Sequence, residues 1–288
     1  MLFRSRSFAC TVIILLVTAV VLAAQWRRRW GDNLDLTDPE MRNGVPMWEQ
    51  DSELPNDVFT FVRLEYNGGG RGRGRGRRGH GGDWATDYPD SDLNFSYRLQ
   101  QLTSLQVHPT GVHLAITDPR LFDFPFVYMV EPGGLYFTAQ EVEILGRYLL
   151  NGGFLMVDDF WGDWEWDNFE TEIKRVFPGR PIVDLELDHP VFRAVFDLKE
   201  KPQVPSIDWA HQGRPYGITY EANKPGAEEV HYRAMFDDAG RMMMIICHNT
   251  DLGDGWEREG EDEWYFRVFS EAKAYPMGIN ILFYALTH

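Results

Sequence analysis

The pattern of apolar and polar residues predicts strands and helices in alternation along most of the chain. The clearest strands are 126–130 (FVYMV) and 154–157 (FLMV), which are apolar on both faces. Between them, apolar residues recur at three- and four-residue spacing over 138–150, which predicts a helix. Thr138 and Glu141 form a T-x-x-E capping box where this helix should begin.

The same pattern predicts further elements of both kinds. Strands are expected at 57–66, 182–185, 216–220, 230–236 and 242–247, and helices at 89–104 and from about 265 to 286. A strand, a helix and a second strand in this order form the βαβ unit, whose crossover is right-handed. We therefore expect an α/β fold with an open, mostly parallel sheet and helices on both faces. In such sheets ligands bind beyond the carboxyl ends of the strands.

The N-terminal part of the chain has a different pattern. Residues 7–25 are 19 positions without a charge, and at ~1.5 Å per residue such a helix covers roughly the ~30 Å hydrocarbon core of a membrane. We expect one N-terminal transmembrane helix that acts as an uncleaved signal anchor. The expected organisation is an anchor over 1–30, a linker over 31–57 and an α/β domain over 58–288, with a Gly/Arg-rich loop at 68–82.

Charge argues against a nucleic-acid partner. The chain has 44 Asp and Glu against 28 Lys and Arg, and so acidic a body repels phosphate backbones. The loop at 68–82 holds five arginines but no aromatic residue on which a base could stack. It is a mobile insertion, a segment attracted to an anionic surface or a nucleic-acid contact, and we favour the first. The two cysteines, Cys10 and Cys247, exclude a Cys-based zinc knuckle, and no disulfide is expected.

Two adjacent acids follow the apolar strand over 154–157. Successive side chains of a strand point to opposite sides, so at most one of Asp158 and Asp159 is expected to face the ligand-binding edge. Three interpretations stay open: the acids cap a turn, they bind a ligand or metal, or one acts as a catalytic acid or base. The tryptophans that follow either close the core or stack on a sugar or a partner.

Polar residues also follow other strands. Asp87 comes after the first strand and its glycine loop, where it either caps the next helix or belongs to the binding edge. The strand over 242–247 leads into a polar segment that predicts a concave polar site. Its candidate residues are His248, Asn249, Asp251 and Asp254. His189 is isolated, and it is either a structural hydrogen-bond partner or a ligand-binding residue.

The topology makes a specific prediction about three of these acids. Asp87, Asp159 and Asp251 follow three different strands, so an open parallel sheet should bring their carboxyl groups to one crevice. Acids gathered there repel one another unless a cation or a ligand donor is present. The residues alone predict no particular metal or cofactor.

Several sequence blocks, in order, resemble a known family. These are WATDYPDSDLNF, LFDFPFVYM, GGFLMVDDFWG, DHPVF and NTDLGDGWE, and they closely resemble the bacterial domain of unknown function 4159 family from about residue 59 to residue 288. The resemblance implies a class I glutamine amidotransferase-like, flavodoxin-like fold. It also implies an inner-membrane location with the domain on the periplasmic or another extracytoplasmic side. An envelope protein partner is implied as well, because some members are encoded beside MoxR-type ATPases and von Willebrand A-domain proteins.

The resemblance does not imply a reaction. The strand GGFLMV resembles the strand that leads to the catalytic cysteine of amidotransferases, but Asp158 and Asp159 stand in that region here, so amidotransferase activity is not expected. No G-x-S-x-G elbow, Walker loop or Rossmann motif is present. Our leading hypothesis is a membrane-anchored α/β domain that binds a small polar ligand or an envelope partner at the carboxyl edge of its sheet. The alternative is a carboxylate-dependent hydrolase, with or without the help of a metal, acting on a carbohydrate.

Overall fold

The computed structural model describes residues 34–50, 57–68 and 83–288. The chain divides into two compact units, Met1–Gly44 and Val45–His288. In the first, Asp38 caps a short 3-10 helix, η1 (Pro39–Met41). The expected membrane anchor and nearly all of the Gly/Arg-rich loop lie outside the described residues. Among the residues that are described, no helix is both long and apolar enough to cross a membrane.

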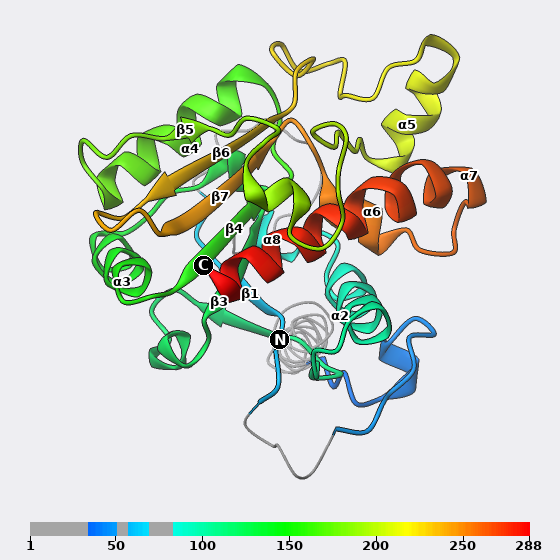
Figure 1. Cartoon of the computed structure of the whole chain (residues 1–288), viewed down its shortest axis with the longest axis horizontal. Coiled ribbons are helices and arrows are strands. Elements are labelled where there is room, and N and C mark those ends of the chain that lie inside the picture. The colour runs from blue at the N-terminus through cyan, green and yellow to red at the C-terminus, as the bar shows by residue number, and fades with distance from the viewer. Residues whose placement is uncertain (1–33, 51–56, 69–82) are drawn as a thin grey trace, which may run out of the picture. The chain divides into compact units, whose positions relative to one another are not determined.

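The second unit contains one mixed sheet, coloured from blue to orange in Figure 1. Its seven described strands have the order β2-β1-β3-β4-β7-β6-β5. They are β1 (Val62–Glu65), β2 (Val112–Ala115), β3 (Phe126–Val130), β4 (Phe154–Asp158), β5 (Val183–Asp184), β6 (His231–Phe236) and β7 (Met242–His248). The strands from β2 to β7 in this order pair in parallel, whereas β6 pairs antiparallel with β7 and with β5. The predicted α/β class is confirmed.

Helices connect the strands and cover the sheet. They are α2 (Asp90–Leu102), α3 (Ala139–Leu150), α4 (Gly162–Val176), α5 (Ile207–Gly213), α6 (Leu252–Glu257), α7 (Glu263–Tyr265), a π-helix η7 (Phe266–Ala274) and α8 (Tyr275–Thr287). Short 3-10 helices are η2 (Asp83–Ala85), η3 (Pro119–Asp123), η4 (Pro132–Gly134), η5 (Pro190–Arg193) and η6 (Arg214–Tyr216). The predicted closing helix corresponds to η7 and α8.

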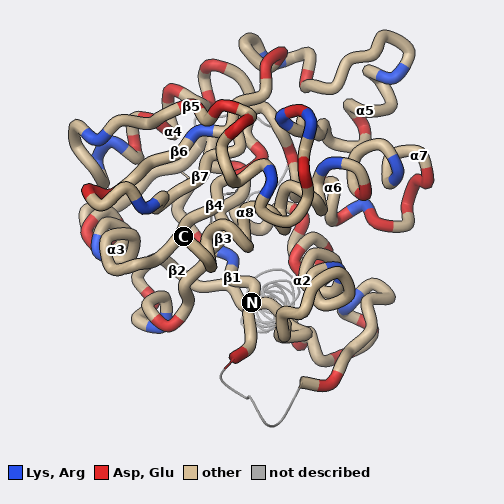
Figure 2. Tube along the Cα trace, viewed as in Figure 1, with Lys and Arg blue, Asp and Glu red and all other residues tan. Residues whose placement is uncertain are grey.

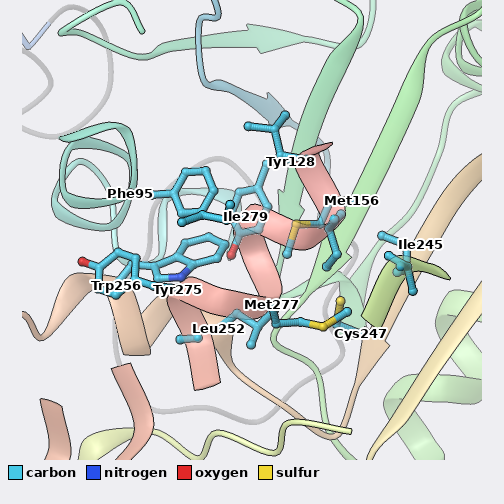
Figure 3. Close-up of a cluster of buried hydrophobic side chains, with 14 of the residues drawn as sticks. Phe95, Tyr128, Met156, Ile245, Cys247, Leu252, Trp256, Tyr275, Met277 and Ile279 are labelled. Carbon is cyan, nitrogen blue, oxygen red and sulfur yellow. The ribbon is translucent and has the colours of Figure 1, made fainter. Parts of the chain in front are cut away.

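Each face of the sheet buries its own apolar core. Successive residues of β3 point to opposite faces, so Tyr128 belongs to one core and Val127 to the other. The first core packs against α2, α6 and α8, and the second against α3 and α4. Figure 3 shows the first core, where Trp256 of α6 lies 4.5 Å from Phe95 of α2 and 5.7 Å from Tyr128 between ring centroids. Helices therefore cover both faces, as predicted.

The strongest local signals are confirmed. The capping box of α3 is present, because the Glu141 backbone N–H donates to Thr138 Oγ1 at 3.2 Å and the Thr138 N–H donates to Glu141 Oε2 at 2.7 Å. The strands predicted at 126–130 and 154–157 are β3 and β4, each buried along its whole length. Local periodicity sufficed here because these elements are buried and unbroken.

Other predictions were wrong. Residues 216–220 form no strand, because Tyr216 ends a 3-10 helix, Gly217 turns the chain at φ 69° and the Tyr216 side chain is 78% exposed. The segment predicted as a strand at 57–66 pairs regularly only over β1. Sequence reasoning also missed β2, α4 and α6. The residues that open α4 and α6 were interpreted as polar loops because glycines and acids dominate there.

Candidate functional site

Three acids meet beyond the carboxyl ends of the parallel strands. Asp87 precedes α2, Asp159 follows β4, and Asp251 follows β7. One carboxylate oxygen from each can be chosen so that all three lie within 4.8 Å of one another. Since β4 and β7 are paired neighbours, residues that follow them are brought together although they are distant in sequence. The predicted convergence of these three carboxyl groups is confirmed, and their role stays a prediction.

Four residues at or beside this site have an uncommon backbone conformation. Asp87, Glu131, Asp159 and Asn249 have φ values of 61°, 48°, 56° and 61°, in the left-handed region that non-glycine residues seldom adopt. The last three follow the ends of β3, β4 and β7 directly or within one residue. The loops after β4 and β7 also hold each other, because the Asp159 N–H donates to the Thr250 carbonyl at 3.2 Å. Such conformations persist only where the surrounding structure fixes them, and they cluster at functional sites.

Asp158, the last residue of β4, lies beneath the three acids. It is 0% exposed, and its Oδ2 accepts hydrogen bonds from the Tyr128 hydroxyl at 3.1 Å and from the Gly253 N–H at 3.0 Å. Its Oδ1 is buried and has no hydrogen-bond partner among the described residues. Burial raises the pKa of Asp158 to about 7. The adjacent acids therefore differ in role: Asp158 is fixed inside the sheet and Asp159 belongs to the converging group.

Gly253 has no Cβ, and the side chains of the site occupy the space beside its Cα. A Cβ at this position would lie 2.8 Å from Asp87 Oδ2, 2.8 Å from the Tyr128 hydroxyl oxygen and 3.5 Å from Asp251 Oδ1. Asp87 Oδ2 is itself buried and without a hydrogen-bond partner among the described residues. Asp87 thus does not cap α2, which has no side-chain N-cap bond. Two buried carboxylate oxygens, on Asp87 and Asp158, remain unsatisfied beside this space.

Burial and mutual repulsion raise the pKa of all three converging acids well above the ordinary range. Burial is the largest cause in each case. The charges of neighbouring acids come next: Glu257 and Asp254 act on Asp87, Glu131 acts on Asp159, and Asp159 acts on Asp251, while the Arg63 charge partly lowers the pKa of Asp87. Figure 2 shows acidic positions, in red, spread over many elements of the trace. A positive charge delivered to this group would favour the ionised acids, so the site is suited to a cation or to a ligand with hydrogen-bond donors.

A second acidic group shares Asp87 but already has a positive partner. Asp87, Asp254 and Glu257 also offer oxygens within 4.8 Å of one another. Arg258 pairs with both of the latter, from its Nε to Asp254 Oδ1 at 3.1 Å and from its Nη2 to Glu257 Oε2 at 2.8 Å. Asp254 Oδ2 accepts from the Ile207 N–H at 2.7 Å. Asp254 therefore holds the surrounding structure in place. Arg258 gives this second group a paired positive charge, and the group of Asp87, Asp159 and Asp251 has no such ion pair among the described residues.

His248 and Asn249 support the edge and do not face a ligand. His248 Nδ1 accepts from Arg233 Nη1 at 2.9 Å, so its Nε2–H donates to the Gly162 carbonyl at 3.1 Å. Burial lowers the pKa of His248 to about 3, and the Arg233 charge adds to the effect. The Asn249 amide accepts from the Gly162 N–H at 2.8 Å and donates to the carbonyls of Gly226 and Glu229, both at 2.7 Å. Every polar atom of both side chains is used.

His189 is not part of the converging group. Its Nδ1 accepts from the Val191 N–H at 3.2 Å, and its ring lies 6.4 Å from that of Phe236 between centroids. Phe236 pairs with Met242 at the beginning of β7, whereas Asp251 follows the end of the same strand. His189 therefore lies toward the opposite end of the β7 strand from the acids, where it caps η5.

Sequence reasoning missed several residues of the site. Tyr128 lies in the middle of a wholly apolar-looking strand, where nothing in the pattern distinguishes its hydroxyl. Glu131 directly follows β3 and could have been found by applying the strand-end rule there. Trp161 Nε1 donates to Asp159 Oδ1 at 3.2 Å, while Trp164 in the first turn of α4 is 61% exposed. The tryptophans therefore include both a buried site residue and an exposed aromatic surface.

One comparison with known proteins bears on this site. The family model described as a domain of unknown function (DUF4159) matches residues 60–286. The chain belongs to the DUF4159 family. No curated protein matches the chain. The DUF4159 match includes all described strands and the three converging acids, so the candidate site lies within the family domain.

Proposed function

We propose that this DUF4159 domain is a binding module for a small polar ligand at the carboxyl edge of its sheet. The observation that carries the proposal is the convergence of Asp87, Asp159 and Asp251 from three separate elements, with oxygens within 4.8 Å of one another. These acids contribute little to the apolar core, and burying them together costs free energy. A bound ligand that neutralises them offsets that cost.

The site favours a ligand that donates hydrogen bonds or carries positive charge. Ionised carboxylates only accept hydrogen bonds, and Asp87 Oδ2 and Asp158 Oδ1 have no partner among the described residues. Lys224 approaches from one side, but its ammonium group is held by Glu165 and by Glu221 at 3.8 Å. An anionic ligand would meet repulsion from every carboxylate of the group.

The second candidate is a carboxylate-dependent hydrolase acting on a carbohydrate. Its supporting observation is the pKa of about 7 at Asp158, because a group with such a pKa can both accept and donate a proton at neutral pH. Two features rank it second. Paired glycosidase carboxyl groups are roughly 5 to 9.5 Å apart, whereas the converging oxygens lie within 4.8 Å. Asp158 is also wholly buried, so a substrate would have to displace its surroundings.

Membrane attachment and partnership belong to the same proposal. We propose that residues 7–25 anchor the domain in the bacterial inner membrane, with the domain on the extracytoplasmic side and an envelope protein as a partner. The apolar length of that segment supports the anchor. We also propose a class I glutamine amidotransferase-like, flavodoxin-like arrangement, for which the parallel β2-β1-β3-β4-β7 core is suitable. Amidotransferase activity is not proposed, because Cys247 is fully buried in β7 and burial raises the pKa of its thiol.

Thermal shift measurements test the binding proposal. The wild-type protein, Asp159→Asn and the exposed control Asp208→Asn are compared with a panel of metal chlorides, organic amines, amino acids and sugars. We expect at least one compound to raise the melting temperature of the wild type and of the control, and not of Asp159→Asn. Equal responses of all three proteins to every compound would contradict the proposal.

A further inference from the structure

We infer that the ligand of this site is a hard divalent cation, Mg²⁺, Mn²⁺ or Ca²⁺, held by Asp87, Asp159 and Asp251. The inference rests on the proposed function and specifies the chemical class of its ligand. The three groups supply only carboxylate oxygens, without sulfur or imidazole. Oxygen-only donor sets suit Mg²⁺, Mn²⁺ and Ca²⁺ and do not suit the softer transition metals.

The spacing of the oxygens fits one ion. Two oxygens that each lie about 2.4 Å from Ca²⁺ can be no more than about 4.8 Å apart, and about 4.2 Å apart for Mg²⁺. The three carboxylates offer oxygens within 4.8 Å of one another, which meets the limit for Ca²⁺, and a smaller ion would draw them closer together. Gly253 permits this close approach, because a Cβ at this position would lie 2.8 Å from Asp87 Oδ2 and 3.5 Å from Asp251 Oδ1. The acids are therefore close enough to share one cation.

An independent observation points to a missing positive partner. Asp158 is 0% exposed, and its Oδ1 has no hydrogen-bond partner among the described residues. Its other oxygen, Oδ2, accepts from the Gly253 N–H at 3.0 Å, and a Cβ on Gly253 would lie 2.8 Å from Asp87 Oδ2 and 3.5 Å from Asp251 Oδ1, so the Asp158 carboxyl borders the same group. Buried polar atoms are satisfied in nearly all native proteins, and each exception requires an explanation. A cation with its bound waters supplies one, because a metal-bound water can donate to the unsatisfied oxygen.

The nearby basic side chains are engaged elsewhere. Arg63 is fixed by Asp92 and by the carbonyls of Trp84 and Thr86, at 3.0 and 2.7 Å. Lys224 pairs with glutamates and Arg258 with Asp254 and Glu257. Within the described part of the chain, no ion pair joins a lysine or arginine to the converging acids. The second acidic group differs, because Arg258 supplies its positive charge. In the first group we assign that role to the cation.

Isothermal titration calorimetry on the full-length protein, purified in detergent and stripped with a chelator, tests the inference. MgCl₂, MnCl₂ and CaCl₂ are titrated separately into the wild type, Asp159→Asn, Asp251→Asn and the exposed control Asp208→Asn. We expect at least one of these cations to bind the wild type. Loss of one ligand charge should weaken its binding at least about tenfold in Asp159→Asn and Asp251→Asn, because the number of charged ligands sets affinity. Asp208→Asn should stay within about threefold, because Asp208 is exposed on α5 and does not belong to the converging acids.

The outcomes separate the inference from the function on which it rests. No cation binding to the wild type, combined with an Asp159-dependent response to an amine or sugar, would overturn the cation assignment and leave the binding function standing. No Asp159-dependent response to any compound would overturn both. Equal weakening of cation binding in Asp208→Asn and Asp159→Asn would also overturn the assignment. Near-ultraviolet circular dichroism confirms that each variant is folded, and Asp251→Asn replaces Asp159→Asn if the latter fails.

Discussion

At the scale of single residues, neighbours in sequence have opposite roles. Asp158 ends β4 and accepts hydrogen bonds from Tyr128 and Gly253, whereas Asp159 turns into the left-handed region and joins the converging acids. His248 and Asn249 are similarly separated from Asp251 by only a few positions, yet their polar atoms are consumed by the protein itself. Residue type alone does not distinguish these roles; the partners do.

Asp158→Asn is expected to stabilise the metal-stripped protein at neutral pH. The pKa of Asp158 rises from 3.8 to about 7 on folding, so between these pH values the folded state holds a proton that the unfolded state has released. The Asp158 carboxyl group therefore lowers the free energy of unfolding as the pH rises through this window. At ~1.36 kcal/mol per pKa unit, the gain from Asp158→Asn should be on the order of 2–4 kcal/mol above pH 7 and close to zero near pH 4. Urea denaturation at several pH values in a chelator checks this, and parallel curves for the two proteins would contradict it.

His248 should remain neutral throughout the physiological range. Its folded pKa of about 3 lies below the ordinary value of 6.5, so the unfolded state gains a proton first as the pH falls. The stability that His248 contributes is thus complete above about pH 6.5 and is lost progressively toward pH 3. Nuclear magnetic resonance of the imidazole protons should show no titration between pH 5 and 8. A midpoint near 6.5 would contradict the buried Arg233–His248–Gly162 chain.

At the scale of elements, short helices position the site. Asp251 is the N-cap of α6, and its Oδ1 accepts from the Asp254 N–H at 2.7 Å. The same carboxylate offers an oxygen to the converging group. One residue therefore links helix initiation to ligand binding, and its two roles can be separated by substitution.

Asp251→Asn and Asp251→Ala should separate capping from binding. Asn is as good an N-cap as Asp and removes a buried acid whose pKa is raised, so Asp251→Asn should leave the metal-stripped protein at least as stable as the wild type, whereas Asp251→Ala should be about 1 kcal/mol less stable than Asp251→Asn because it loses the cap. Both variants lose the carboxylate and should lose the ligand response. Denaturation and thermal shift measurements on the same samples check both parts. A full ligand response in Asp251→Ala would remove Asp251 from the site.

Gly253→Ala is expected to destabilise the protein although alanine is the better helix former. The substitution should gain about 1 kcal/mol of helix propensity. The new Cβ, however, would lie 2.8 Å from Asp87 Oδ2 and from the Tyr128 hydroxyl oxygen. Overpacking of this kind costs roughly 1–3 kcal/mol and fills the space between the acids. Denaturation should show a net loss of stability, and calorimetry a loss of cation binding. An unchanged affinity would show that the space is not used.

At the scale of the whole molecule, the compact unit with the sheet begins at Val45. Trp48 belongs to it, because its Nε1 donates to the Val107 carbonyl at 2.7 Å and its ring lies 5.7 Å from that of Tyr97 between centroids. The family match begins later, at residue 60. Residues before the first strand thus contribute to the packing of the domain, within the span first interpreted as a linker.

Deletion of residues 1–44 should leave a protein that unfolds cooperatively. The remaining unit keeps both cores, and it loses the uncharged segment at 7–25. Deletion of residues 1–57 should lower the melting temperature further, because it also removes Trp48 and its contacts. Calorimetry of both truncated proteins checks the order. Equal melting temperatures would show that Trp48 adds nothing to the stability of the domain. Aggregation of the protein that lacks only residues 1–44, despite good expression, would contradict the boundary at Val45.

The sequence by itself determined what depends on short-range pattern. Buried β3 and β4 follow from apolar runs, α3 follows from its spacing and capping box, and the convergence of Asp87, Asp159 and Asp251 follows from the rule for strand ends. Elements with weak local signals were not found, because the apolar residues of α4 and α6 are mixed with glycines and acids.

Only the tertiary structure decided which polar residues are available for a ligand. The partners of Asn249 arrive from Gly162, Gly226 and Glu229, and the partner of His248 arrives from Arg233 on a neighbouring strand. The antiparallel pairing of β6 with β7 likewise places Phe236, and with it His189, at the beginning of β7, whereas Asp251 follows the end of that strand. Which groups meet is decided by the order in which strands pack over two cores, and that order depends on contacts between residues distant in the chain. Local pattern therefore predicted where a site could be, and long-range packing decided which side chains form it.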